Sequence, residues 1–130
     1  MKKRIKSCAK LLTRQGFDCI IISKPVNITY LTGCSQPDGY LLLTSDQKLI
    51  YFTNFIYMKA SQQIKIWQLV ISDNKRNIFN LVSNTLKKLK CKKVAFEGKH
   101  LPFLEYKTLK QKLASSSISF LETKDFVEGL

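Results

Sequence analysis

Hydrophobic residues recur at helical spacing in the opening segment, which predicts an amphipathic helix over residues 4–15. The positions that would face a core lie three and four residues apart: Ile5, Cys8, Ala9 and Leu12. The opposite face is strongly basic, and Gly16 is expected to end the helix. The apolar residues 18–23 that follow are typical of a short strand covered on both faces, with Pro25 at its end.

A pair of antiparallel strands is predicted next. Residues 26–32 leave room for one or two turns of helix, and Gly33 can serve as its C-cap. The segments 40–44 and 48–53 have strand character, and the turn-forming residues between them, Ser45-Asp46-Gln47, make a connection of hairpin length.

Helices and strands then alternate to the end of the chain. The strongest stripe of apolar residues predicts a helix over residues 76–90. The other expected elements are a helix over 55–63, strands over 66–71, 94–97 and 118–121, and a helix that begins near Pro102. This order predicts one α/β domain over residues 1–130, with a mixed, mainly parallel sheet and helices on both of its faces.

Composition agrees with a single globular domain, because 45% of the 130 residues are hydrophobic and 24% are charged. The longest apolar runs, 19–22 and 40–43, are far shorter than the roughly 20 residues that cross a bilayer. Lys6, Lys10 and Arg14 interrupt any apolar segment of a secretion signal. We therefore expect a soluble, cytoplasmic protein without a membrane partner.

The net charge of +13 raises an alternative, a stand-alone basic module that binds nucleic acid or another polyanion. The charge comes almost entirely from lysines spread along the chain, with only Arg4, Arg14 and Arg76 to supply the guanidinium groups that recognise bases and phosphates. Solvated surface is therefore the first expectation for these lysines, and nucleic acid is not the favoured partner.

No group of residues predicts a self-contained active site. The four cysteines include no C-x-x-C pair and the chain has one histidine, so no zinc site is expected. Cys34 with His100 is the one conceivable nucleophile and base, and it is not favoured over a structural role. The acidic residues of the middle and later elements are expected to be solvated at the surface: Asp38, Asp46, Asp73, Glu97 and Glu105. The chain itself is thus expected to hold no catalytic residue, metal or cofactor, and its reduced cysteines suit the cytoplasm.

Several segments, in order, resemble the N-terminal domain of the creatinase, prolidase and Xaa-Pro aminopeptidase family. The strongest match is the string Asn27-Ile28-Thr29-Tyr30-Leu31-Thr32-Gly33. The others are Gly16-Phe17-Asp18 followed by Ile20-Ile21-Ile22, the hairpin segments 41–44 and 49–53, Tyr57 with Ala60, Val94-Ala95-Phe96-Glu97-Gly98, and the segment with Tyr106 and Leu109.

The resemblance implies a sheet of the ribonuclease H-like type and a non-catalytic N-terminal domain of a proline-specific metallopeptidase, either an Xaa-Pro dipeptidase or an Xaa-Pro aminopeptidase. In that family a separate C-terminal domain, missing from this chain, binds two divalent metals, usually manganese or cobalt, and hydrolyses the peptide bond before proline. The present domain is then expected to pack on its own catalytic domain, to support a homo-oligomer and to restrict the cleft to short proline-containing peptides.

The same resemblance supplies the candidate site residues, Tyr30, Gly33, Asn54 and Tyr57, as contacts to the substrate cleft or to the other domain. Asn54 and Ile56 stand where the family commonly has Asp and Arg, and Cys34 stands where an aromatic residue is common. Contacts that those family side chains make are therefore not expected to carry over unchanged.

Overall fold

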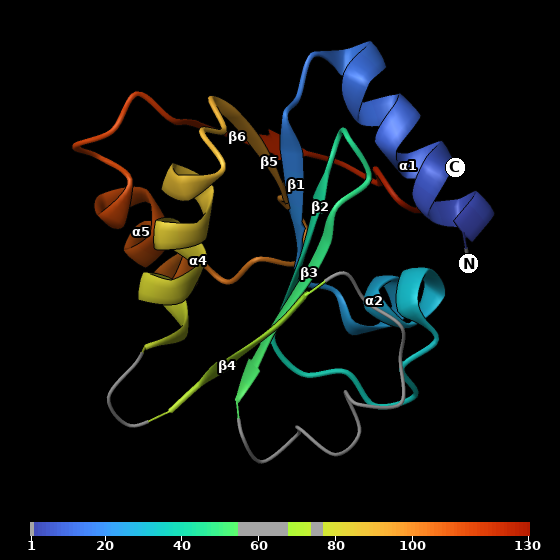
Figure 1. Cartoon of the computed structure of the whole chain (residues 1–130), viewed down its shortest axis with the longest axis horizontal. Helices are drawn as coiled ribbons and strands as arrows, with labels where there is room; N and C mark the ends of the chain where they lie inside the picture. The colour runs from blue at the N-terminus through green and yellow to red at the C-terminus, as the bar shows by residue number, and fades with distance from the viewer. Residues whose placement is uncertain (1, 55–67, 74–76) are drawn as a thin grey trace.

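Six strands form one mixed sheet in the computed structural model, which describes residues 2–54, 68–73 and 77–130 (Figure 1). The strands are β1 (Cys19–Ile22), β2 (Tyr40–Thr44), β3 (Leu49–Asn54), β4 (Gln68–Ser72), β5 (Lys93–Glu97) and β6 (Ser119–Thr123). The described helices are α1 (Lys2–Gln15), α2 (Pro25–Thr32), α4 (Ile78–Lys88) and α5 (Phe103–Lys112).

The strand order across the sheet is β4-β3-β2-β1-β5-β6. Strand β2 runs antiparallel to both of its neighbours, β1 and β3, whereas the pairs β3–β4, β1–β5 and β5–β6 are parallel. The carboxyl ends of β1, β3, β4, β5 and β6 therefore meet at one edge of the sheet, which we call the carboxyl edge. The predicted mixed, mainly parallel sheet is confirmed.

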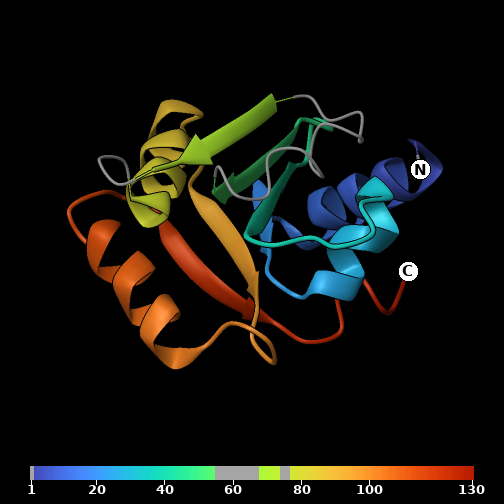
Figure 2. The same cartoon turned by 90° about the horizontal axis from the view of Figure 1, so that it is seen from below.

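Helices cover both faces of the sheet, with α1 and α2 on one side and α4 and α5 on the other (Figure 2). Strand β1 shows why both faces need cover, because all four of its side chains are buried. Cys19 and Ile21 belong to the core under α4 and α5, and Ile20 and Ile22 belong to the core under α1 and α2. The expected two-sided burial of this strand is thus confirmed.

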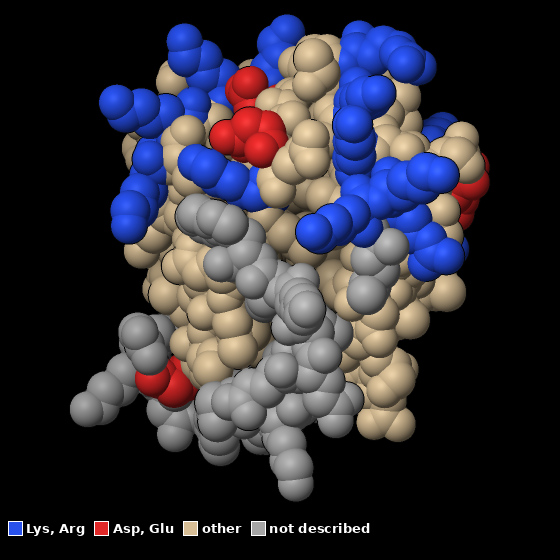
Figure 3. Space-filling model, turned by 45° about the vertical axis from the view of Figure 1, so that its right-hand side comes forward, with Lys and Arg blue, Asp and Glu red and all other residues tan. Residues whose placement is uncertain are grey.

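The basic face of the first helix is also as expected. Cys8, Ala9 and Leu12 of α1 are buried, while its lysines and arginines are exposed. Figure 3 shows Lys and Arg side chains spread over this side and the adjoining end of the molecule, with few acidic side chains among them.

Most element boundaries agree with the sequence. Helix α2 has eight residues and ends at Gly33, whose φ of 81° is left-handed, as a C-cap requires. Strand β4 is described from Gln68 onward, and the first two residues expected for it, 66 and 67, lie outside the described residues. The helix expected over 55–63 lies outside the described residues, as does the start of the one expected over 76–90, and Asn77 caps α4.

Within the described part of the chain, no helix combines the length and apolar character that crossing a bilayer requires.

The parallel pair β1–β5 holds the two halves of the sheet together. Its ladder is short, with Cys19, Ile20 and Ile21 in register with Val94, Ala95 and Phe96. Asp18 extends the pairing at the amino ends of both strands. Its backbone N–H donates to the carbonyl of Lys93 at 2.8 Å, and its Oδ2 accepts from the N–H groups of Lys92 and Lys93 at 2.8 and 2.9 Å. These backbone donors, assisted by the nearby ammonium groups, hold the pKa of Asp18 below its usual value of 3.8.

Asp18→Asn is expected to lower the free energy of unfolding at pH 7 by roughly 0.5–1 kcal/mol, because neutral hydrogen bonds at a partly exposed site replace charge-assisted ones. A carboxylate with a lowered pKa in the folded state stabilises fully above its ordinary value of 3.8 and loses that contribution as the pH falls through the folded value. The difference between wild type and variant should therefore be constant near neutrality and shrink below that value. Urea unfolding across this pH range measures it, with the exposed Glu122→Gln as control. If the difference in free energy of unfolding persists unchanged in acid, the charge of Asp18 is not the source of the stabilisation of the folded state.

Candidate functional site

A buried carboxylate lies at the carboxyl edge of the sheet. Glu97 is the last residue of β5 and is only 6% exposed. One oxygen, Oε1, accepts hydrogen bonds from the backbone N–H groups of Ser23 and Lys24 at 2.7 and 2.8 Å. The other, Oε2, accepts from Nδ2 of Asn27 at 2.5 Å. Both oxygens therefore have partners, which is the condition for a stable buried charge.

Glu97 fixes the start of α2 from a distant part of the chain. Lys24 is the N-cap residue of α2, but its side chain makes no capping hydrogen bond, and Pro25 at the first helical position has no N–H to donate. The carboxylate of Glu97 takes over the neighbouring donors, and the positive end of the helix favours its charge. The direction in which α2 leaves the sheet is thus determined by a side chain of β5.

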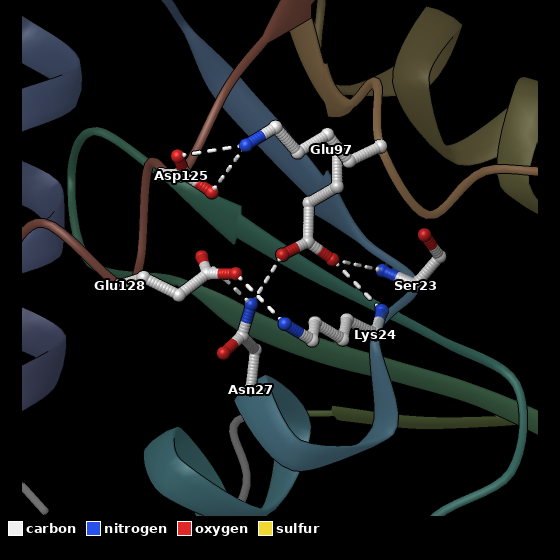
Figure 4. Close-up of polar contacts among 7 residues, drawn as sticks. Ser23, Lys24, Asn27, Glu97, Asp125 and Glu128 are labelled. Atoms are coloured by element: carbon white, nitrogen blue, oxygen red, sulfur yellow. Dashed lines mark hydrogen bonds and ion pairs between the residues drawn. The ribbon is translucent and has the colours of Figure 1, made fainter.

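The final segment of the described chain joins the same cluster (Figure 4). Glu128 accepts from Asn27 Nδ2 at 3.2 Å and pairs with Lys24 Nζ at 3.1 Å. Partial burial acts to raise the pKa of Glu128, but its own backbone N–H, Lys24 and Asn27 together outweigh burial and hold that pKa below the usual range. Lys99 Nζ contacts Asp125 at 3.0 Å. We call the set Ser23, Lys24, Asn27, Glu97, Lys99, Asp125 and Glu128 the edge cluster.

A hollow of about 370 Å³ opens beside the edge cluster, where the strands of the sheet end. Its polar lining comes from separate elements: Ser23, Asp38, Ser72, His100 and Glu105. The hydroxyl of Ser23 is buried and has no hydrogen-bond partner among the described residues. Burial raises the pKa of Glu105. The carboxyl edge of a parallel sheet is where α/β proteins commonly bind other groups, which makes this hollow a candidate site.

Two of the four sequence-derived candidates share one helix. Tyr30 lies on α2 and is 38% exposed, with the Arg4 guanidinium carbon 4.1 Å from its ring centre and Arg4 Nη1 donating to its carbonyl at 2.9 Å. Gly33 is the C-cap of that helix, and its N–H donates to Thr29. Neither residue belongs to the edge cluster.

Asn54, the third candidate, is placed elsewhere, as the last residue of β3 in register with Ser72 of β4. Tyr57 and Ile56 lie outside the described residues. The role of all four candidates as contacts to a cleft or another domain stays a prediction.

The expectation that Glu97 is a solvated surface carboxylate is wrong. Its three donors lie 70 or more residues away in the sequence, so no local pattern marks the side chain as buried. The sequence predicts no site role for Asn27, although Asn27 belongs to the string that resembles the family, and it predicts no site role for Glu128. The one available signal was the position of Glu97 at the end of a buried strand, directly before Gly98. A side chain at Gly98 would meet the Glu122 side chain, whose Cγ lies 2.1 Å from the position of a Cβ there.

Cys34, the conceivable nucleophile, is buried directly after α2, and its carbonyl accepts from the Thr29 hydroxyl at 2.7 Å. His100 is exposed in the turn that follows β5. Their positions give no support to the disfavoured pairing of the two side chains as nucleophile and base.

The family model of the creatinase/prolidase N-terminal domain matches residues 4–130, nearly the whole chain. The chain belongs to this family. Among curated proteins, an Xaa-Pro dipeptidase of Pyrococcus furiosus is 30% identical over 67 residues, which are 51% of this chain and 19% of that relative. The match thus spans about one fifth of the relative's length.

Solved structures show the same creatinase/prolidase N-terminal fold. The N-terminal domain of the cytoplasmic peptidase PepQ from Mycobacterium tuberculosis has a TM-score of 0.86 at 20% identity, with 98% of this chain and 97% of that one covered. An Xaa-Pro dipeptidase from Bacillus anthracis has a TM-score of 0.84 at 22% identity, with 98% of this chain but only 35% of that chain covered. The edge cluster therefore lies in a domain whose fold recurs within longer peptidases.

Glu97→Ala is expected to lower the free energy of unfolding by roughly 2–4 kcal/mol, because it leaves two backbone N–H groups and the Asn27 amide without their acceptor in a buried place. Glu97→Gln keeps the shape and one acceptor oxygen but brings a second amide toward Asn27, so a smaller loss is expected. Urea denaturation at neutral pH measures both, with Glu122→Ala, at an exposed residue of β6, as control. Equal stability of wild type and Glu97→Ala would contradict the role assigned to the carboxylate.

Proposed function

We propose that this chain is the non-catalytic N-terminal domain of a proline-specific metallopeptidase, an Xaa-Pro dipeptidase or Xaa-Pro aminopeptidase, and that catalysis belongs to a further domain. Two findings support the proposal. The family model covers residues 4–130, and the curated relative from Pyrococcus furiosus bears the name Xaa-Pro dipeptidase. The short share of that relative's length, 19%, leaves room for a separate catalytic domain.

The described residues do not fit the pair of divalent metals, manganese or cobalt, that such a peptidase would use. Among them, no three His, Cys, Asp or Glu side chains come together as ligands. The carboxylates of the edge cluster already have other partners: Glu97 accepts from N–H groups, and Asp125 and Glu128 face the ammonium groups of Lys99 and Lys24. We therefore assign the metal pair to the further domain.

The family match over residues 4–130 carries the proposal, and the way in which the segment 125–130 is attached bears on how a following domain would be placed. Phe126 and Val127 are buried in the core shared with α1 and α2. Glu128 is held between Lys24 and Asn27, and Leu130 N donates to Val127 O at 3.1 Å. The C-terminal residue lies beside α1 (Figure 1). A segment attached in this way would give a following domain a defined orientation instead of a flexible tether.

The hollow beside the edge cluster adds a surface for such packing, since it offers polar groups and the buried Ser23 hydroxyl, which has no partner among the residues that the structure describes. We extend the proposal to a homo-oligomer in the cytoplasm, in which this domain limits the catalytic cleft to short proline-containing peptides. Tyr30, Gly33, Asn54 and Tyr57 remain the proposed contacts to that cleft or to the catalytic domain.

The purified 130-residue chain is expected to fold but to leave Xaa-Pro dipeptides and Xaa-Pro-Yaa tripeptides intact, with or without added Mn²⁺ or Co²⁺. Chromatography that detects the released N-terminal amino acid measures this hydrolysis.

In source cells, an antibody raised against the chain should detect a protein much larger than 15.0 kDa. Hydrolysis by the chain alone, or a cellular protein of 15.0 kDa, would overturn the proposal.

A salt titration distinguishes the proposed function from the alternative, in which the chain binds nucleic acid or another polyanion. Lysines that neutralise phosphates would bind labelled DNA or RNA with an affinity that falls steeply as salt rises. Under the proposed function, the chain binds neither at moderate salt.

A further inference from the structure

Two cysteine thiols lie against each other at the amino end of the β1–β5 pair. Cys19 is the first residue of β1, Cys91 lies two residues before β5, and their Sγ atoms are 3.5 Å apart. Both thiols are free and buried. We propose that Cys19 and Cys91 form a reversible oxidation site, at which a peroxide-class oxidant converts the two thiols into a disulfide that joins β1 to the turn between α4 and β5.

The backbone holds both cysteines in place. Cys19 is paired with Thr44 of β2 on one side and with Val94 of β5 on the other. Cys91 ends the turn that closes α4: Lys90 takes a left-handed φ of 58°, Lys90 N donates to Lys87 O, and Cys91 N donates to Leu86 O at 3.2 Å. This is the Schellman arrangement of a helix end. Because the sheet and the helix end hold both backbones, the two Sγ atoms stay close to each other in the folded chain, at the 3.5 Å that the structure gives.

An oxidant can reach Cys91. This side chain is 7% exposed and lines a hollow of about 310 Å³ at the amino end of the sheet. The other residues of that hollow are Asp18, Thr44, Ser45, Asp46, Lys48, Leu89 and Lys90. Cys19 is fully buried behind Cys91. The geometry therefore assigns the first attack to Cys91 and the second to Cys19.

The hydrogen bond between the thiols suits these roles. Cys19 donates its S–H to Cys91 Sγ, which lowers the pKa of Cys91 and raises that of Cys19. Cys91 loses its proton, and the thiolate attacks one oxygen of the peroxide, so that the O–O bond breaks and Cys91 becomes a sulfenic acid. The departing hydroxide takes up the proton that Cys91 released and leaves as water, or as an alcohol where the peroxide is organic. Cys19 Sγ then attacks Cys91 Sγ, the S–O bond breaks, its thiol proton leaves with the hydroxyl as water, and the disulfide forms. Two thiols are oxidised by two electrons and the peroxide is reduced by two.

The other two cysteines serve as internal controls. Cys8 lies in the core on the other face of the sheet, and burial raises its pKa to about 12, which leaves it almost entirely as the unreactive thiol. Cys34 is buried after α2 and belongs to neither core cluster. Of the four cysteines, all in the described part of the chain, Cys19 and Cys91 are the two that contact each other.

The test is mild oxidation of the folded 130-residue chain with hydrogen peroxide, followed by alkylation of the remaining thiols and peptide mapping. The expected product is a monomer with a disulfide between Cys19 and Cys91, two alkylated cysteines at Cys8 and Cys34, and recovery of four free thiols with dithiothreitol. The oxidised protein should melt roughly 5–10 °C higher than the reduced one, because the bond closes a long loop of chain.

Cys91→Ala and Cys19→Ala should each abolish the internal disulfide, whereas the matched Cys34→Ala should form it as the wild type does. Circular dichroism checks that each variant is folded, and the mapping of wild-type protein does not depend on any variant. A bond that forms only in urea, a bond to Cys8 or Cys34, or four free thiols after oxidation of the folded chain would overturn the proposal.

Discussion

The parallel pairing of β1 with β5 is the constraint on which the rest of the structure depends. On one side of it lie β2, β3 and β4, on the other lies β6, and only three residue pairs make its ladder. Two carboxylates extend this short contact, one at each end. Asp18, before β1, accepts from the N–H groups at the start of β5, and Glu97, at the end of β5, accepts from the N–H groups that follow β1. Each strand thus supplies the carboxylate that binds the backbone of the other.

This reciprocal arrangement explains why two of only nine acidic residues lie here in a chain of net charge +13. Backbone N–H groups just outside a parallel ladder have no partner in the sheet. At the Glu97 end, where the site is more buried, leaving the Ser23 and Lys24 N–H groups without an acceptor would cost about 1–3 kcal/mol each. A carboxylate can accept from two of them at once. At the carboxyl edge, Glu97 also accepts a hydrogen bond from the Asn27 amide, which in turn donates to Glu128. The side chain that completes the ladder therefore also orients α2 and is linked to Glu128 through Asn27.

Sequence periodicity predicted what local interactions decide. The alternation of buried faces in β1, the buried stripe of α4 and the end of α2 at Gly33 all follow from residues within a few positions of each other. Glu97 and Asp18 could not be assigned in this way, because the groups that donate to their carboxylates lie 70 or more residues away and become neighbours only when β1 and β5 pair. The contact between Cys19 and Cys91 has the same origin, since the two residues are 72 positions apart in the sequence. The family resemblance predicted the fold but pointed to Tyr30 and Gly33, outside the edge cluster that the structure assembles around Asn27.

The two ends of the β1–β5 pair differ in what they can do. The carboxyl edge holds the segment 125–130 through the contacts of Glu128 with Asn27 and Lys24. The amino end holds the thiols of Cys19 and Cys91 beside Asp18, at the opposite end of the same strands. A disulfide there would reinforce a junction already held by Asp18 without touching the edge cluster. Oxidation is therefore expected to change the stability of the domain while leaving the orientation of the segment after β6 unchanged.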